Sequence, residues 1–225
     1  MKGRTNTLFI LLMSVYGFAN SNGNNFVNEY FDTVLNTALQ MELGSLGLDP
    51  VFLPDFDTDF DDRIKLIGRV HGIANFYDGQ LGGLGNARRK GDCSGPFLDW
   101  NMPFINCSLG LDDLKIYFKG KLKYGKLPTV SITARANLTS TLMSVIIANY
   151  PINVNNLRSV SFLKIGQIQP KFTGLGSPLN KYLDVLEKGF IDHAWPAVIN
   201  MISLNFLYAL QNAVFAVPFM WYTAF

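Results

Sequence analysis

The stretch "LKIYFKGKLKY", residues 114–124, decides the fold class because apolar and basic side chains alternate along it. Its apolar parity holds Leu114, Ile116, Phe118, Leu122 and Tyr124, and its other parity holds Lys115, Lys119, Lys121 and Lys123. Side chains of a β-strand point alternately to opposite faces. The pattern therefore predicts a strand with one buried face and one lysine-rich face in water.

Similar segments on both sides predict that this strand belongs to an antiparallel sheet. The turn-forming "YGKLPT", residues 124–129, predicts a hairpin to the next strand. Further strands are predicted at residues 64–76, 130–138, 142–149 and 160–168. Their alternation gives the sheet one apolar face and one polar face, which is typical of an antiparallel meander.

Two helical regions flank the predicted strands. Apolar residues recur at helical spacing over residues 24–43, and Gly44 is a suitable end for that helix. Near the other end of the chain, Ser177 and Pro178 predict an N-cap and a first-turn proline. Pro196 should kink this second helix without ending the helical region.

These elements predict an α+β fold formed by one domain, residues 20–225. The sheet has one apolar face, and both helices have broad apolar faces that must be covered. A curved antiparallel sheet wrapped around the long helices, as an elongated roll, satisfies both requirements.

An acidic stretch, "LGLDPVFLPDFDTDFDD" at residues 46–62, separates the first helix from the strands. Its alternating aspartates resemble the start of a calcium loop, but Phe60 and Leu66 occupy positions where an EF-hand needs glycine and glutamate. We interpret the stretch as a linker with its carboxylates in water and with Phe52, Phe56 and Phe60 pointing inward. No metal ion or other cofactor is expected.

The glycine-rich segment "DGQLGGLGNARRKGD", residues 78–92, has neither the P-loop nor the dinucleotide-binding pattern. Its glycines are interpreted as positions of strand twist, bulges or close approach by a helix. Arg88, Arg89 and Lys90 are interpreted as a solvated turn, with attraction of anionic lipid headgroups as the alternative.

The N-terminus predicts export. Residues 1–19 combine a basic start, a short apolar run and small residues, which is typical of a secretory signal peptide. In an oxidising compartment Cys93 and Cys107 are expected to form a disulfide. Asn106 and Asn137 lie in glycosylation sequons, and Asn137 is the better candidate because it falls on the polar face of a strand.

Composition and motifs argue against two classes of function. The net charge of +2 provides no field that would attract nucleic acid. No motif of a nucleophile elbow or a metalloprotease is present, so an enzyme is not expected. Hydrophobic residues make up 48% of the chain and charged residues 16%, so excess apolar surface has to be covered.

The last 32 residues, 194–225, contain no charged side chain. A helix enclosed in a groove of its own protein would be equally poor in charge, and so would a membrane anchor. We favour the groove, because polar residues interrupt the segment and no basic residue follows it.

The order of these elements resembles the group 7 mite allergens and, more broadly, the arthropod juvenile-hormone-binding and takeout proteins of the tubular lipid-binding superfamily, which includes bactericidal permeability-increasing protein. The resemblance covers roughly residues 26–213. Besides the two helices, its carriers are "LGLDP" (46–50), "LPDFDTDF" (53–60) and "IGRVHGIANFYDGQLGGLGNARRKGD" (67–92). Such families are secreted, non-catalytic and hold apolar ligands between a curved sheet and a long helix. Hormone-binding and takeout members carry a disulfide near the N-terminus, whereas these cysteines lie mid-chain, so ligand residues cannot be carried over.

We therefore expect a secreted, extracellular binding protein for lipids or other hydrophobic small molecules. The alternative is an interaction module that recognises microbial lipid surfaces or a protein partner, with membrane contact through the apolar C-terminus; a homodimer is left open. The candidate ligand-lining residues are Leu66, Val70, Phe76, Trp100, Phe104, Ile116, Phe118, Ile132, Leu186, Trp195, Ile202 and Phe206. Each of them could equally fill a dry core.

Overall fold

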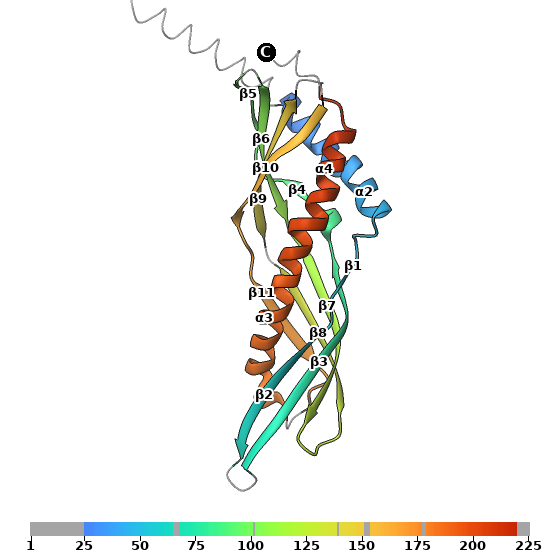
Figure 1. Cartoon of the computed structure of the whole chain (residues 1–225), viewed down its shortest axis with the longest axis vertical. Coiled ribbons are helices and arrows are strands. Elements are labelled where there is room, and N and C mark those ends of the chain that lie inside the picture. The colour runs from blue at the N-terminus through green and yellow to red at the C-terminus, as the bar shows by residue number, and fades with distance from the viewer. Residues whose placement is uncertain are drawn as a thin grey trace, which may run out of the picture.

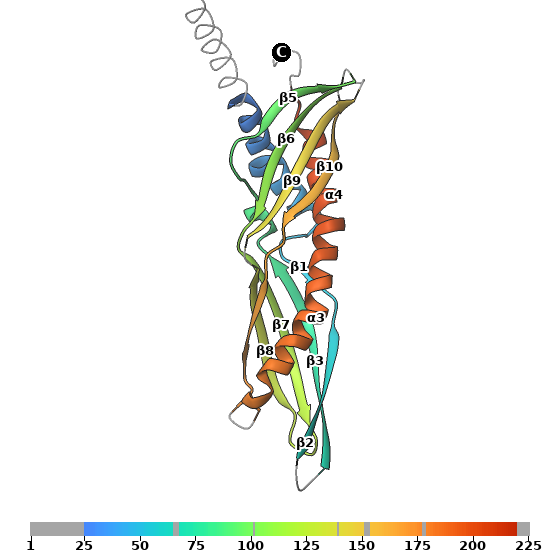
Figure 2. The same cartoon turned by 90° about the vertical axis from the view of Figure 1, so that its left-hand side faces the viewer.

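The chain forms an elongated rod in which a long helix runs along two β-sheets (Figure 1, Figure 2). The computed structural model describes residues 25–64, 68–100, 102–138, 140–150, 154–176 and 179–219, and the side chains among them except those of 62–69, 150 and 154. The predicted signal peptide and the predicted cap at Ser177 and Pro178 lie outside these residues. The predicted α+β roll of antiparallel sheet and long helices is confirmed.

The lower half of the rod in Figure 1 is built on a six-stranded sheet. Its path is β1-β3-β7-β8-β11, with β2 paired to β3, and every pairing is antiparallel. The strands are β1 (Val51–Leu53), β2 (Phe56–Ile64), β3 (Gly68–Gly82), β7 (Leu114–Tyr124), β8 (Val130–Leu138) and β11 (Ile168–Thr173). In β7 the apolar parity is buried and the lysines are exposed, as the alternation predicts.

The upper half contains a second, five-stranded sheet. Its path is β10-β9-β6-β4, with β5 paired to β6, again antiparallel throughout. The strands are β4 (Arg88–Arg89), β5 (Ser94–Asp99), β6 (Met102–Leu111), β9 (Thr141–Tyr150) and β10 (Val154–Lys164). The predicted disulfide between Cys93 and Cys107 is confirmed and ties β6 to the segment that precedes β5.

The prediction of a single meander is therefore wrong, because the chain passes repeatedly between the two sheets. The predicted strand 160–168 shows this most clearly, since β10 ends at Lys164 and β11 begins at Ile168 in the other sheet. At this junction the amide of Gly166 donates a hydrogen bond to the buried Thr141 hydroxyl, 3.3 Å away. Alternation shows which face of a strand is buried, but it does not show which strand lies beside it.

The interpretation of residues 46–62 as a linker is also wrong, because most of the stretch forms β1 and β2. Asp57, Asp59 and Asp61 of β2 do lie on its exposed parity, and Phe60 on the other parity is buried. Phe56 is half-buried, but Phe52 is 73% exposed. Val51 and Leu53 occupy the inward parity of β1, so Phe52 between them must face solvent.

The first helical segment covers residues 25–45, as predicted to within two residues at its end, and includes η1 (Val34–Ala38) and α2 (Leu39–Ser45). The second helical segment continues without a break for 37 residues, Asn180–Ala216, and includes Pro196, so the proline does not end it, as predicted. Its parts are η3 (Asn180–Tyr182), α3 (Leu183–Met201), η4 (Ile202–Phe206) and α4 (Leu207–Ala216). By length and composition this one helix could cross a membrane, a property that core helices share.

This long helix buries one face and exposes another. The buried face comprises Leu186, Phe190, Ala194, Val198, Ile202, Phe206, Ala209, Leu210, Ala213 and Val214. Leu204, Tyr208 and Phe215 on the other side are each at least 59% exposed. The predicted groove therefore covers the helix on one side only, because the two sheets and the first helix leave its outer face in solvent.

Candidate functional site

The lower half contains an aromatic cluster centred on Phe190 of α3. Four phenylalanine rings from four strands surround it, with ring centroids 5.4 to 5.8 Å from that of Phe190. They are Phe56 of β2, Phe76 of β3, Phe118 of β7 and Phe172 of β11. The angles between these rings and the ring of Phe190 are 60° or more, the tilted and edge-on arrangements that aromatic pairs favour.

Glycine makes room for this cluster in the sheet. A Cβ atom at Gly79 of β3 would lie 2.2 Å from the ring of Phe118, so no larger residue fits there without movement. The glycines of this strand were expected to permit a bulge or a close approach, and the β3–β7 register does shift between Tyr77 and Gln80. The bulge and the missing side chain allow the Phe118 ring to approach the strand closely.

The structure places seven of the twelve expected ligand-lining residues on buried faces. Phe76, Ile116, Phe118 and Ile132 face inward from the lower sheet, and Leu186, Ile202 and Phe206 face inward from the long helix. Val70 and Trp195 are half-buried and pack against the same core, although Trp195 is on the flank of the helix. Leu66 lies outside the described side chains.

Two of the twelve expected residues, Trp100 and Phe104, do not line the interior. Trp100, in the turn after β5, is 92% exposed. Phe104 lies on the parity of β6 opposite to the buried Ile105, where its ring is 5.3 Å from that of Phe97. Both assignments are corrected because strand register, which was not known from the sequence, directs these side chains outward.

The interior continues into the upper half without interruption, as one hydrophobic core. There α4 packs against η1, α2 and β10. Among the described side chains, none of the buried ones is an aspartate, glutamate, lysine or arginine. The interior therefore offers an apolar environment along the whole rod, with only a few neutral polar groups.

Three of those polar groups lie together at the upper end. Tyr30 is 6% exposed, Asn149 of β9 is 7% exposed and Asn155 of β10 is 4% exposed. Burial raises the pKa of Tyr30, and the nearby Asn155 amide opposes this only in part. In the described part of the chain, the Tyr30 hydroxyl and Asn149 Oδ1 are the buried side-chain atoms without a hydrogen bond. Leaving such an atom unpaired costs about 1–3 kcal/mol.

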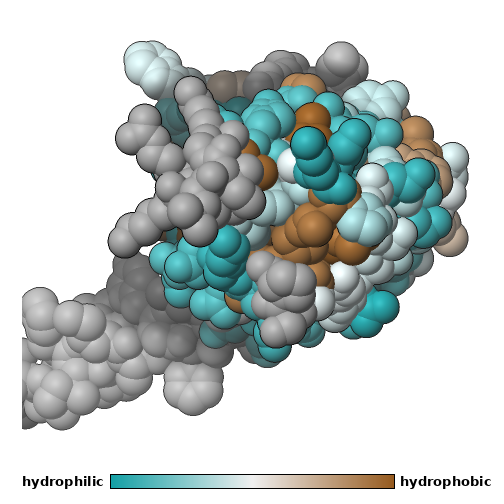
Figure 3. All heavy atoms as spheres, turned by 90° about the horizontal axis from the view of Figure 1, so that it is seen from below, coloured by the Kyte–Doolittle hydropathy of each residue, from teal (hydrophilic) through white to brown (hydrophobic). Residues whose placement is uncertain are grey.

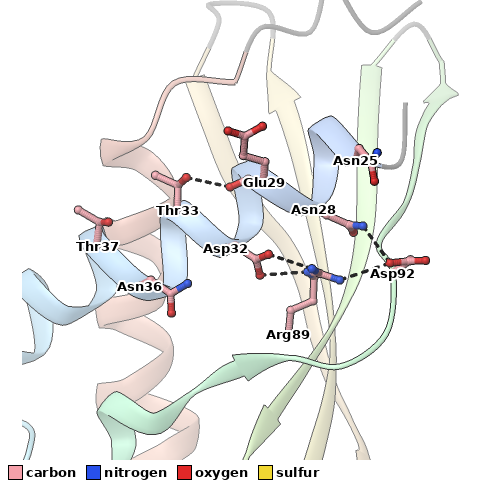
Figure 4. Close-up of a pocket in the computed structure, with 9 residues that line it drawn as sticks. All are labelled: Asn25, Asn28, Glu29, Asp32, Thr33, Asn36, Thr37, Arg89 and Asp92. Atoms are coloured by element: carbon pink, nitrogen blue, oxygen red, sulfur yellow. Dashed lines mark hydrogen bonds and ion pairs between the residues drawn. The ribbon is translucent and has the colours of Figure 1, made fainter. Parts of the chain in front are cut away.

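A polar hollow of about 570 Å³ lies beside the first helix and involves Arg89 (Figure 4). Arg89 donates to both carboxylate oxygens of Asp32, at 3.0 and 2.8 Å, and Asp32 raises the pKa of this guanidinium. Lys90 pairs with Asp112, and Arg88 donates to the carbonyl oxygens of Gly85 and Ala87. The interpretation of these three residues as a turn is wrong, because Arg88 and Arg89 form β4, whereas the expected exposure to solvent holds for Arg88 and Lys90.

Exposed apolar side chains gather at both ends of the rod. At the upper end, the β5–β6 hairpin exposes Phe97, Leu98 and Trp100. At the lower end, Figure 3 shows an apolar patch framed by hydrophilic side chains. The β7–β8 turn, which also lies in the lower half of Figure 1, exposes Leu127 at 47%. Isolated apolar residues on a surface are ordinary, whereas such clusters mark sites of contact.

Sequence reasoning missed the residues at the centre of the interior. Phe190 was recognisable only as one member of the apolar face of a helix, and Phe56 was assigned to a linker. Phe172 lay outside every predicted strand. Tyr30 and Asn149 carried no signal in the sequence, because an unpaired polar atom can be recognised only from its surroundings.

The fold and its interior define an α+β rod with an apolar core enclosed by two sheets and a long helix. The model of the group 7 allergen family matches residues 26–204, and the chain belongs to this family. A search of curated protein sequences found no match.

Two solved structures are similar to the chain. Takeout 1 of Epiphyas postvittana is 18% identical with a TM-score of 0.39, and the match covers 85% of this chain and 92% of that one. A lipopolysaccharide binding protein is 22% identical with a TM-score of 0.40, and the match covers 77% of this chain and 38% of that one.

Proposed function

We propose that the protein is a secreted, non-catalytic carrier of lipids or other hydrophobic small molecules, formed by residues 20–225. The observation that carries this proposal is the continuous apolar interior, in which no described aspartate, glutamate, lysine or arginine is buried. The family of the chain and the order of its elements agree with it.

Binding in such an interior is driven by removal of apolar ligand surface from water. This contributes about 25 cal/mol per Å² of buried apolar area. The five-phenylalanine cluster around Phe190 offers ring faces and edges to an alkyl chain. The long helix runs along the rod (Figure 2), and its buried apolar residues belong to the one core cluster, so a long, thin ligand fits this interior better than a compact one.

The test is to incubate the purified mature protein with a lipid extract and to identify retained molecules by mass spectrometry. We expect lipids with alkyl chains to remain bound through gel filtration, and a fluorescent apolar probe to be displaced by them. Absence of both retained lipid and probe displacement would contradict the carrier function.

A variant with a filled interior sharpens this test. Ala194 lies on the buried face of α3, and Ala216, at the end of α4, is exposed. We expect Ala194→Phe to reduce lipid retention and Ala216→Phe to leave it unchanged. Equal retention by the two variants, both folded by circular dichroism, would show that the ligand binds elsewhere.

A second candidate function is docking on a lipid surface, and the β5–β6 hairpin favours it. Trp100 at 92% exposure and Leu98 at 62% are the side chains that enter a membrane interface most readily. We expect Trp100→Ala to weaken co-sedimentation with phosphatidylcholine vesicles and Trp195→Phe to preserve it. Unchanged sedimentation of the Trp100 variant would exclude docking through this hairpin.

Secretion and glycosylation belong to the same proposal. Asn137 is exposed on β8, whereas the half-buried Asn106 accepts a hydrogen bond from Ser144 at 2.9 Å. We therefore expect a glycan on Asn137 in protein recovered from the medium of eukaryotic cells. Asn137→Gln should abolish the mass shift produced by an endoglycosidase, and a shift that persists would assign the glycan to Asn106.

A further inference from the structure

The upper end of the interior carries a polar cluster that an apolar core does not need. Asn149 and Asn155 are directly opposite each other in the β9–β10 ladder, and both side chains are buried. Tyr30 approaches them from the first helix, close enough for the Asn155 amide to influence the phenol. One hydrogen-bonding group from each of three elements thus converges at the same end of the core.

A short C-terminal segment covers this cluster. The Asn155 amide donates to the Val217 carbonyl oxygen at 2.8 Å, and the Phe219 ring is 4.7 Å from that of Tyr30. Phe219 also contacts Phe26, with ring centroids 5.1 Å apart. The cluster is therefore enclosed by side chains of the described residues and shielded from bulk water.

Two atoms of the cluster have unused hydrogen-bonding capacity. The Tyr30 hydroxyl proton has no acceptor and Asn149 Oδ1 has no donor in the described part of the chain. The nearby Asn155 amide lowers the pKa of the phenol, so it acts as a donor toward the Tyr30 oxygen and leaves the hydroxyl proton to donate elsewhere. Buried polar groups in folded proteins are nearly always paired, so an unpaired donor and an unpaired acceptor that both adjoin Asn155 indicate a missing partner.

We propose that Tyr30 and Asn149 bind the neutral hydroxyl head of a lipid whose alkyl chain lies in the apolar interior. This inference rests on the carrier function proposed above. A hydroxyl accepts from the Tyr30 phenol and donates to Asn149 Oδ1, so one ligand group satisfies both atoms.

A carboxylate fits the cluster less well than a hydroxyl. It has no proton for Asn149 Oδ1, and among the described side chains no lysine or arginine is buried to compensate its charge. The phenol also remains protonated, since burial raises the pKa of Tyr30. The cluster therefore selects an alcohol over the anion of a fatty acid.

The test compares three probes with the same alkyl chain: hexadecanol, ionised hexadecanoate and hexadecane. Each displaces a neutral fluorescent probe, N-phenyl-1-naphthylamine, from the delipidated full-length mature protein. We expect Tyr30→Phe to weaken hexadecanol binding about tenfold relative to hexadecane binding, the loss of one buried hydrogen bond. Using this ratio removes differences in aqueous solubility between the probes.

Asn149→Leu separates the alcohol from the acid. We expect it to weaken hexadecanol binding about tenfold relative to hexadecane and to leave hexadecanoate binding unchanged or improved. The matched control is Tyr117→Phe, which removes a phenol from the outer parity of β7, beneath Arg135. This control should leave all three affinities unchanged.

The outcomes distinguish this inference from the carrier function. Equal changes for hexadecanol and hexadecane in both variants would overturn the headgroup site and leave the carrier function intact. Failure of all three probes to displace the dye from the unmodified protein would overturn both proposals. If a variant unfolds, the other variant still decides, because each removes one of the two hydrogen bonds.

Discussion

The two halves of the rod enclose the same core in different ways. In the lower half the interior is filled by aromatic rings around Phe190, all contributed by strands of one sheet. In the upper half a helix and the second sheet place Tyr30, Asn149 and Asn155 at the end of that interior. Both buried unpaired side-chain atoms of the described chain belong to the upper half.

Under the proposed carrier function, this difference would give the two halves separate roles, one holding the alkyl chain and the other selecting the headgroup. Aromatic and aliphatic contacts have little directionality, so under the proposed carrier function the lower half would discriminate little among alkyl chains of differing shape. Hydrogen bonds require matched donors and acceptors at short distance, so the headgroup site proposed for the upper half would distinguish one headgroup from another. The two halves can be tested separately by changing one and leaving the other intact.

The largest effect is expected from removing the centre of the lower cluster. Phe190→Ala should lower the free energy of unfolding by about 3–5 kcal/mol, because it creates a cavity among four rings. Phe215→Ala on the same long helix is the control, since that side chain is 64% exposed and should contribute less than about 0.5 kcal/mol. Equal urea midpoints for the two variants would show that the lower half is not a packed aromatic core.

The disulfide is expected to be the main covalent support of the upper half. Its cysteines are 14 residues apart, and replacing both by alanine should lower the free energy of unfolding by about 3 kcal/mol. Reduction of the unmodified protein should produce a similar loss, which urea unfolding with and without reductant will measure. A reduced protein as stable as the oxidised one would contradict this role.

A smaller effect is expected at Asp49, where the chain leaves the first helix. Its two carboxylate oxygens accept hydrogen bonds from the amides of Gly83 and Gly85, each at 2.6 Å. Asp49→Ala should lower the free energy of unfolding by about 1–2 kcal/mol, because these bonds are charge-assisted but exposed. Asp55→Ala, at an exposed position before β2, should change it by less than about 0.5 kcal/mol.

The smallest effect has the opposite sign. In the delipidated protein Tyr30→Phe should raise the free energy of unfolding by up to about 1 kcal/mol, since it removes a buried hydroxyl whose proton has no acceptor among the described residues. Thermal unfolding of delipidated Tyr30→Phe and Tyr117→Phe proteins will compare a buried phenol with one on the outer face. Destabilisation by Tyr30→Phe would mean that the hydroxyl is already paired when the ligand is absent.

Several features of the fold were predictable from local patterns. The alternation of residues 114–124 predicted both the strand and the direction of its lysines, because strand geometry imposes a period of two. The apolar spacing of residues 24–43 predicted the first helix for a similar reason. The cysteine pair also formed as expected.

The candidate site was predictable only in part. Phe76 and Phe118 were recognised because they lie on the apolar parity of their strands. Trp100 and Phe104 were assigned wrongly, since an aromatic side chain near a hairpin turn can face either way. The convergence of Phe56 and Phe172 on Phe190 depends on contacts between residues far apart in the chain.

Local sequence patterns thus established that the chain forms amphipathic strands and helices with a large apolar face to cover, because periodicity is a property of neighbouring residues. Long-range packing divided the strands between two sheets, left one face of the long helix in solvent and placed a phenol beside two carboxamides. Those outcomes depend on which segments lie side by side, and that is settled by how the whole chain buries its apolar surface.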